Sequence, residues 1–102
     1  MNKREAFDLL EKSSTIEDQF EAAYNILKHS PPISQDKMLL LYAYYKQALF
    51  GDFKKTEENQ VSNYIQTFKN NAWIQVNGMK AISAKEKYIE FTKELIKSEY
   101  PE

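Results

Sequence analysis

Residues 38–50 read MLLLYAYYKQALF, and the first eight of them are apolar on every side of a helix. A surface helix needs an apolar stripe only about 100° wide to face its core. Ser34 is placed to cap this segment and Gly51 to end it, which predicts a helix over residues 34–50. One face of that helix carries Met38, Leu41, Tyr42, Tyr45 and Leu49, and a second carries Leu39, Leu40, Ala43 and Phe50. The helix therefore has two apolar faces, whereas a domain this small offers one core.

The second apolar face has two interpretations. In the first, neighbouring helices pack on both sides of a central helix. In the second, one face meets the core and the other meets a ligand or partner. The three tyrosines favour the second interpretation, because each joins an apolar ring to a hydroxyl that needs a hydrogen-bond partner when buried. Lys46 follows Tyr42 by one helical turn, and this phenol and ammonium suit a phosphate beside a ring such as a purine.

The chain before this segment also has helical periodicity. Only two glycines and three prolines interrupt 102 residues, which favours a few long helices over many strands. Thr15 is placed to cap a helix, with Asp18 three positions on, and the sequence Ser30-Pro31-Pro32 is expected to end it. The first dozen residues predict a further short helix that either docks or frays, because so short a helix is marginal alone in water.

Two more helices are expected after Gly51. One lies between Glu57 and Val76, with Val61 on its apolar stripe and Gly78 at its C-terminal cap. The other opens with the capping-box sequence Ser83-Ala84-Lys85-Glu86 and ends before Pro101. The sequence thus predicts an all-α fold of four helices, with residues 1–14 as an N-terminal extension and residues 15–100 as the functional domain.

Composition and motif content argue against several classes of function. The net charge of −1 argues against a nucleic-acid partner, and the absence of cysteine removes thiolate metal sites. The sequence has no metal-ligand cluster, phosphate loop or nucleophile with an evident base, so we expect neither a metal nor an enzyme. No segment is apolar enough for a secretory signal or a membrane span, so we expect a cytoplasmic protein.

The sequence Leu41-Tyr42-Ala43-Tyr44-Tyr45-Lys46-Gln47-Ala48, followed by Gly51-Asp52, resembles the signature of the acyl-CoA-binding protein family. Further matches occur in the same order as in the family. They are Phe20-Glu21-x-Ala23, Ala72-Trp73, Gly78-Met79, Ala84 and Tyr88-Ile89. The resemblance covers the chain from about Ile16 to Leu95.

This resemblance implies a four-helix, up-down-down-up bundle that binds, transports and buffers long-chain fatty acyl-CoA esters without catalysis. It implies a monomer with no cofactor besides this ligand, in transient contact with membranes or with enzymes that use acyl-CoA. The ligand-binding positions that it implies are Lys28, Tyr42, Ala43, Tyr44, Tyr45, Lys46, Lys69 and Tyr88. The positions that it implies for the acyl-chain groove are Phe20, Tyr24 and Leu27.

The chain departs from the family pattern at four places. Asn70 stands where an aromatic residue is usual, Ile65 where lysine is common, Tyr24 where the residue is commonly small, and Glu57-Glu58 where a loop normally contains proline. We expect these departures to change affinity and chain-length preference rather than the class of ligand.

Two rival functions remain. One is a helical protein–protein interaction module that uses the aromatic groove of helix 34–50, and the other is a hydrolase of CoA thioesters.

Overall fold

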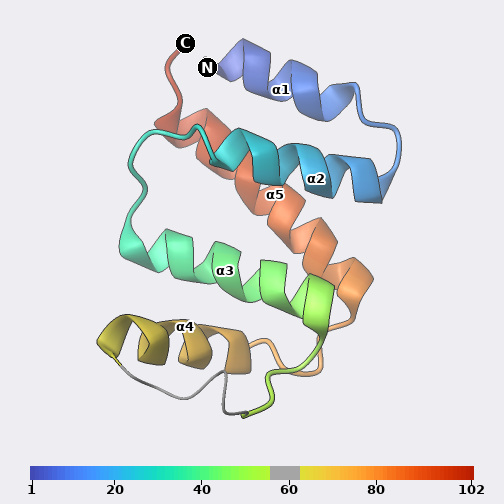
Figure 1. Ribbon diagram of the computed structural model, residues 1–102. Helices are drawn as coiled ribbons and strands as arrows, with labels where there is room; N and C mark the ends of the chain where they lie inside the picture. Colours follow the sequence, from blue (N-terminus) through green and yellow to red (C-terminus); the bar gives the residue numbers. More distant parts are fainter. Residues whose placement is uncertain (56–62) are drawn as a thin grey trace. The chain divides into compact units, whose positions relative to one another are not determined.

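The computed structural model describes residues 1–55 and 63–102, and across these residues it contains five α-helices and no strand (Figure 1). The helices are α1 (Lys3–Glu11), α2 (Ile16–Leu27), α3 (Gln35–Phe50), α4 (Tyr64–Ile74) and α5 (Ala81–Glu99). The all-α prediction is confirmed. Among the described helices, none has the length and apolar character that crossing a membrane requires.

The chain divides into two compact units. The first contains residues 1–33 and 85–102, and so holds α1, α2 and most of α5. The second contains residues 34–84, and so holds α3, α4 and the first turn of α5.

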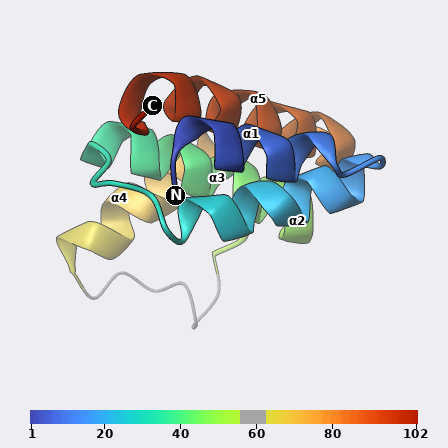
Figure 2. The same cartoon turned by 90° about the horizontal axis from the view of Figure 1, so that it is seen from above.

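In the first unit, the N-terminal helix is docked. The side chain of Asn2 caps α1 by accepting a hydrogen bond from the Glu5 N–H at 2.9 Å, and the Glu5 carboxylate accepts from the Asn2 N–H. Ala6 and Leu10 are buried, and α1 packs beside α2 (Figure 2). The Lys3 N–H donates to the Pro101 carbonyl at 2.8 Å, which joins the two ends of the chain. The expected short helix therefore docks rather than frays.

Residues from α2, from α5 and from the segment after α5 also meet in the core of the first unit. The rings of Phe20 and Tyr88 lie 4.9 Å apart between centroids, and the Tyr100 hydroxyl donates to the Ile26 carbonyl at 2.9 Å. The cap predicted at Thr15 is confirmed, because its hydroxyl accepts a hydrogen bond from the Asp18 N–H.

In the second unit, α3 packs against α4. Ser34 caps α3, and Gly51 follows its last residue with φ of 77°, a conformation that glycine adopts without steric cost. Both predicted ends of this helix are confirmed. The side chain of Asn63 caps α4 by accepting from the Gln66 N–H at 2.9 Å.

Two predicted helix boundaries differ from the structure. The helix expected between Glu57 and Val76 is α4, which ends at Ile74, so Gly78 lies in the turn beyond it rather than at its cap. Glu57, Glu58 and Val61 lie outside the described residues. The start expected at Ser83 is wrong, because α5 begins at Ala81. The Ala84 N–H donates to the Lys80 carbonyl, so the helical hydrogen bonds already enclose Ser83.

Candidate functional site

Two lysines from different helices converge on one tyrosine in the second unit. Tyr42 lies on α3, and the Lys46 ammonium, one turn later, is 5.6 Å from its ring centroid. The Lys69 ammonium reaches the same ring from α4, at 5.4 Å. Both distances fall within the range of cation–π attraction. We call these three residues the cation cluster. The cluster places two positive charges beside one phenol, as an anionic ligand with an aromatic ring would require.

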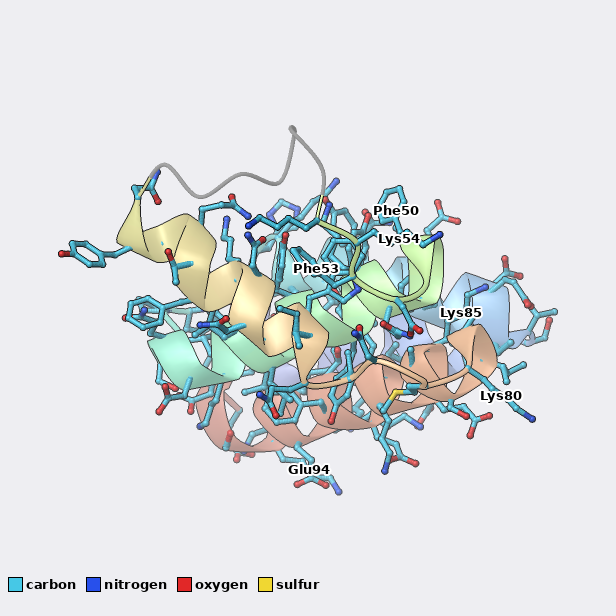
Figure 3. All side chains as sticks on the ribbon, turned by 90° about the horizontal axis from the view of Figure 1, so that it is seen from below. Phe50, Phe53, Lys54, Lys80, Lys85 and Glu94 are labelled. Carbon is cyan, nitrogen blue, oxygen red and sulfur yellow. The ribbon has the colours of Figure 1, made fainter. Side chains whose placement is uncertain are left out.

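The Lys46 side chain rests on further aromatic residues. Its ammonium is 4.8 Å from the ring centroid of Phe50 and 5.9 Å from that of Trp73. The Trp73 indole N–H donates to the Gly51 carbonyl at 2.8 Å, and its ring packs edge-on against Phe53. Figure 3 labels Phe53 on the segment that follows α3. These rings leave Lys46 half-buried and limit the orientations that its charge can take.

The signature residues Gln47 and Asp52 hold the end of α3 in place. The Gln47 side chain is only 1% exposed, and its amide donates to the Asp52 carboxylate and to the Met79 carbonyl, both at 2.8 Å. The same carboxylate oxygen accepts from the Gly78 N–H at 2.7 Å. The hydrogen bonds from Gly78 and then Gln47 hold the pKa of Asp52 below its ordinary value. These residues thus support the helix end that carries Lys46.

An apolar groove of about 410 Å³ adjoins the cation cluster. Its lining residues are Gln35, Met38, Leu39, Tyr42, Ile65 and Lys69. Met38 is 57% exposed and Ile65 is 65% exposed, so two large apolar side chains face solvent beside the cluster. Exposed apolar surface next to convergent polar groups is typical of a ligand site. Tyr42 and Lys69 belong to both the groove and the cluster.

Gln35, Met38, Leu39 and Ile65 were not among the predicted site residues. The apolar stretch from Met38 to Tyr45 did contain a signal, because it had more apolar faces than one core can bury. Ile65, which stands where lysine is common in the family, extends the apolar wall of the groove. Periodicity alone could not show which side of α3 lies open beside α4.

Other predicted site residues lie in the first unit. Tyr24 is exposed, and the Lys28 ammonium lies 4.8 Å from its ring centroid. Tyr88 is 4% exposed and Phe20 is buried, and their contact places both rings in the core of this unit. Leu27 is half-buried at the end of α2.

The remaining predicted residues are on α3, where Ala43 is buried and Tyr44 and Tyr45 are half-buried. Asn70, the departure on α4, is also buried, and its side-chain oxygen accepts from the Gln66 amide at 2.8 Å. A polar residue is tolerated there because this hydrogen bond offsets its desolvation. In residues 1–55 and 63–102, no group of three or more His, Cys, Asp or Glu side chains could hold a metal ion.

Comparisons with known proteins show the family and the fold of this chain. The sequence model of the family described as acyl CoA binding protein matches residues 17–92. A relative from Caenorhabditis elegans, acyl-CoA-binding protein homolog 3, is 31% identical over 80 residues, which is 74% of this chain and 68% of the relative. The crystal structure of Oryza sativa acyl-CoA-binding protein 2 has a TM-score of 0.74 and 31% identity, covering 81% of this chain and 92% of that one. The resemblance seen in the sequence and the fold class that it implied are confirmed.

Proposed function

Because the chain belongs to the acyl-CoA-binding protein family, we propose that it binds long-chain fatty acyl-CoA esters without catalysis, and that it buffers and transports them. One observation carries the proposal. Tyr42 and Lys69 lie in the cation cluster and also line the apolar groove, so one surface offers charge and apolar area together. An acyl-CoA ester has the same two parts, an anionic nucleotide and an apolar chain.

The cation cluster suits the nucleotide end of this ligand. A 3′-phosphate monoester carries about −1.5 to −2 charge near pH 7, by analogy with phosphorylated side chains. Lysine binds phosphate as a point charge, and Lys46 and Lys69 offer two such charges from two helices. The Tyr42 hydroxyl adds a hydrogen-bond donor on the same ring. We therefore assign the 3′-phosphate and its ribose to these three residues.

The groove suits the acyl chain. At about 30 Å³ for each water-sized group, a volume of about 410 Å³ holds on the order of fourteen methylene-sized groups. That capacity favours a long chain. Burial supplies roughly 0.8 kcal/mol for each methylene, offset by several kcal/mol of lost freedom on association. We assign the chain to the wall formed by Met38, Leu39 and Ile65.

The family resemblance adds further contacts to the proposal. It assigns the ligand to Lys28, Ala43, Tyr44, Tyr45 and Tyr88, and the acyl chain to Phe20, Tyr24 and Leu27. Tyr88 is 4% exposed and packs against Phe20, so little of its surface is left for its proposed contact with adenine. We propose residues 15–100 as the binding domain, acting as a cytoplasmic monomer.

Calorimetric titration of palmitoyl-CoA into the full chain tests this function, with free CoA and free palmitate as controls. We expect one-to-one binding of the ester and far weaker binding of either half. Recovery of the intact ester after incubation would support a carrier, whereas steady loss of thioester would indicate a hydrolase. Absence of binding across chain lengths, from folded protein free of carried-over ligand, would contradict the proposal and favour the interaction module.

A further inference from the structure

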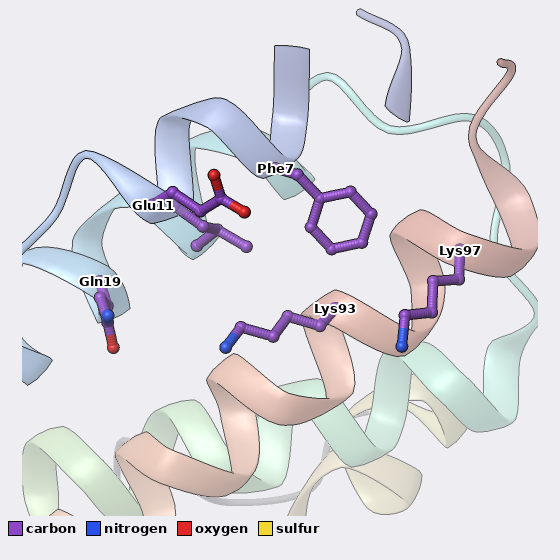
Figure 4. Close-up of a pocket in the computed structure, with 6 residues that line it drawn as sticks. Phe7, Glu11, Gln19, Lys93 and Lys97 are labelled. Atoms are coloured by element: carbon purple, nitrogen blue, oxygen red, sulfur yellow. The ribbon is translucent and has the colours of Figure 1, made fainter. Parts of the chain in front are cut away.

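A second cavity, of about 220 Å³, lies in the first unit and involves none of the residues assigned to the ester. Helix α1 contributes Phe7, Leu10 and Glu11, α2 contributes Gln19, and α5 contributes Lys93 and Lys97 (Figure 4). The family match spans residues 17–92, so five of these six residues lie outside it. The N-terminal extension and the end of α5 thus create a cavity that the family match does not include.

The wall formed by α1 is fixed by several contacts. The capping box at Asn2 and Glu5 stabilises its first turn, and the burial of Ala6 and Leu10 anchors one face. Lys3 holds the helix to the C-terminal segment through its N–H on Pro101 and its ammonium on the Glu102 carboxylate, at 2.8 Å each. Because these contacts hold α1 in place, the helix can form a stable side of the cavity.

The lining combines an apolar wall with an excess of positive charge. Half-buried Phe7 supplies most of the apolar surface, because Leu10 is only 2% exposed, and Figure 4 shows Lys93 and Lys97 on α5 across from Glu11. The two lysines are four residues apart, which places them on one side of the helix. Among the described residues, neither has a carboxylate within 4 Å, Glu11 included. Two ammonium groups against one carboxylate leave one positive charge for a ligand.

We infer that this cavity binds the carboxylate of a short aliphatic acid, with the carboxylate at Lys93 and Lys97 and the chain against Phe7. A single negative charge matches the net charge of the lining. At about 30 Å³ for each water-sized group, about 220 Å³ holds on the order of seven such groups. That is close to the eight non-hydrogen atoms of a six-carbon acid. A bare phosphate would leave the apolar wall uncovered, and a nucleotide exceeds the volume.

Binding here couples to the N-terminal helix. Because α1 supplies half of the lining, the ligand binds only while α1 is docked. A ligand that binds the docked state alone stabilises that state in proportion to its concentration. Hexanoate should therefore slow amide hydrogen exchange in α1, and this effect should occur with or without palmitoyl-CoA on the protein.

The test is a titration of hexanoate into the isotope-labelled full chain, followed by amide NMR. Acetate, which lacks the chain, and 1-hexanol, which lacks the charge, are the ligand controls. We expect hexanoate to shift the amides of Phe7, Gln19, Lys93 and Lys97, and to bind at least five-fold more tightly than either control. Shifts centred on Leu39 and Ile65 instead would overturn the inference, because they would place hexanoate in the groove of the second unit.

The variant Lys93→Gln/Lys97→Gln removes the charges from two exposed positions, so the fold should survive. We expect hexanoate binding to weaken at least five-fold, while the matched variant Lys87→Gln, at an exposed position on the same helix, retains it. Palmitoyl-CoA binding should be unchanged in both variants, which separates this site from the proposed function. Unchanged hexanoate affinity in the double variant, or equal affinity for 1-hexanol, would overturn the proposal.

Discussion

The Lys69 ammonium on α4 lies 5.4 Å from the ring centroid of Tyr42 on α3, so a charge from one helix meets an aromatic ring from the other. This pair also lines the apolar groove, and it therefore connects the two kinds of surface that an acyl-CoA ester needs. Lys46, 5.6 Å from the same ring, doubles the positive charge.

Removing either charge of the cluster should weaken ligand binding. Hydrogen bonds to charged groups contribute roughly 1.5–3 kcal/mol, and each 1.4 kcal/mol is about tenfold in affinity. We expect Lys46→Gln and Lys69→Gln each to lower palmitoyl-CoA affinity about tenfold by calorimetry. Lys80→Gln, an exposed lysine of the same unit outside the groove, is the control and should have no effect (Figure 3). Equal losses in all three variants would indicate only general electrostatic attraction.

The groove should set the dependence of affinity on chain length. Each buried methylene contributes roughly 0.8 kcal/mol, so affinity should rise from octanoyl-CoA through dodecanoyl-CoA to palmitoyl-CoA. In Ile65→Gln and Met38→Gln we expect a shallower rise, with octanoyl-CoA the least affected. Ile82→Gln provides a matched change at another exposed isoleucine of the second unit, and its slope should equal the wild-type slope. An unaltered slope in the groove variants would place the chain elsewhere.

Tyr100 should make the first unit sensitive to alkaline pH. Burial raises the pKa of its phenol above the ordinary value of about 10. The Tyr100 phenol therefore ionises at a lower pH in the unfolded chain than in the folded protein. The contribution of the protonated phenol to the free energy of unfolding is complete below pH 10 and is lost as the pH rises through the folded pKa. Tyr100→Phe also removes the hydrogen bond to Ile26, at a cost of about 1 kcal/mol at pH 7.

Urea denaturation at pH 7 and above pH 10 measures both effects. We expect the wild type to lose stability between these pH values and Tyr100→Phe to lose less. Tyr64→Phe changes a tyrosine that is 84% exposed, and it should behave as the wild type does. Identical alkaline losses in all three proteins would show that Tyr100 is not the responsible group.

Asp52 should stabilise the second unit at neutral pH. Hydrogen bonds from Gly78 and Gln47 lower the pKa of the Asp52 carboxyl. Its contribution to the free energy of unfolding is therefore present above the ordinary Asp pKa of about 3.9 and is lost as the pH falls through the folded pKa. We expect Asp52→Ala to reduce the free energy of unfolding at pH 7 and to differ less from the wild type at pH 2.5. Glu90→Ala, at an exposed position on α5, should have little effect at either pH. A constant difference between Asp52→Ala and the wild type would exclude ionisation as the cause.

Much of the fold could be predicted from local sequence signals. Ser34, Gly51 and Thr15 mark helix ends through their own side chains or backbone freedom, and the structure confirms all three. The helix start predicted at Ser83 is wrong because the same capping-box pattern also fits inside the first turn of a helix. The turn around Gly78 lets α5 begin two residues earlier, at Ala81. A local pattern cannot fix a boundary when the neighbouring turn also permits helix.

The site could be predicted only in part. The family resemblance implied Tyr42, Lys46 and Lys69 as binding positions, and the structure brings these three side chains together. It did not identify Met38 or Ile65, because their part in the groove depends on how α3 packs against α4. The cavity beside Phe7 was also not foreseen, since its lining residues lie far apart in the chain and mostly outside the family pattern.

The central claim is that the cation cluster binds the 3′-phosphate of an acyl-CoA ester. The most direct measurement is calorimetric titration of palmitoyl-CoA and of its 3′-dephospho analogue into the wild type and into Lys69→Gln. We predict that loss of the phosphate weakens binding to the wild type at least tenfold and weakens binding to Lys69→Gln less, because in that variant the interaction between the phosphate and Lys69 is already absent and only the one with Lys46 is left to lose. Equal losses in the two proteins would contradict the account, since the phosphate would then bind independently of Lys69.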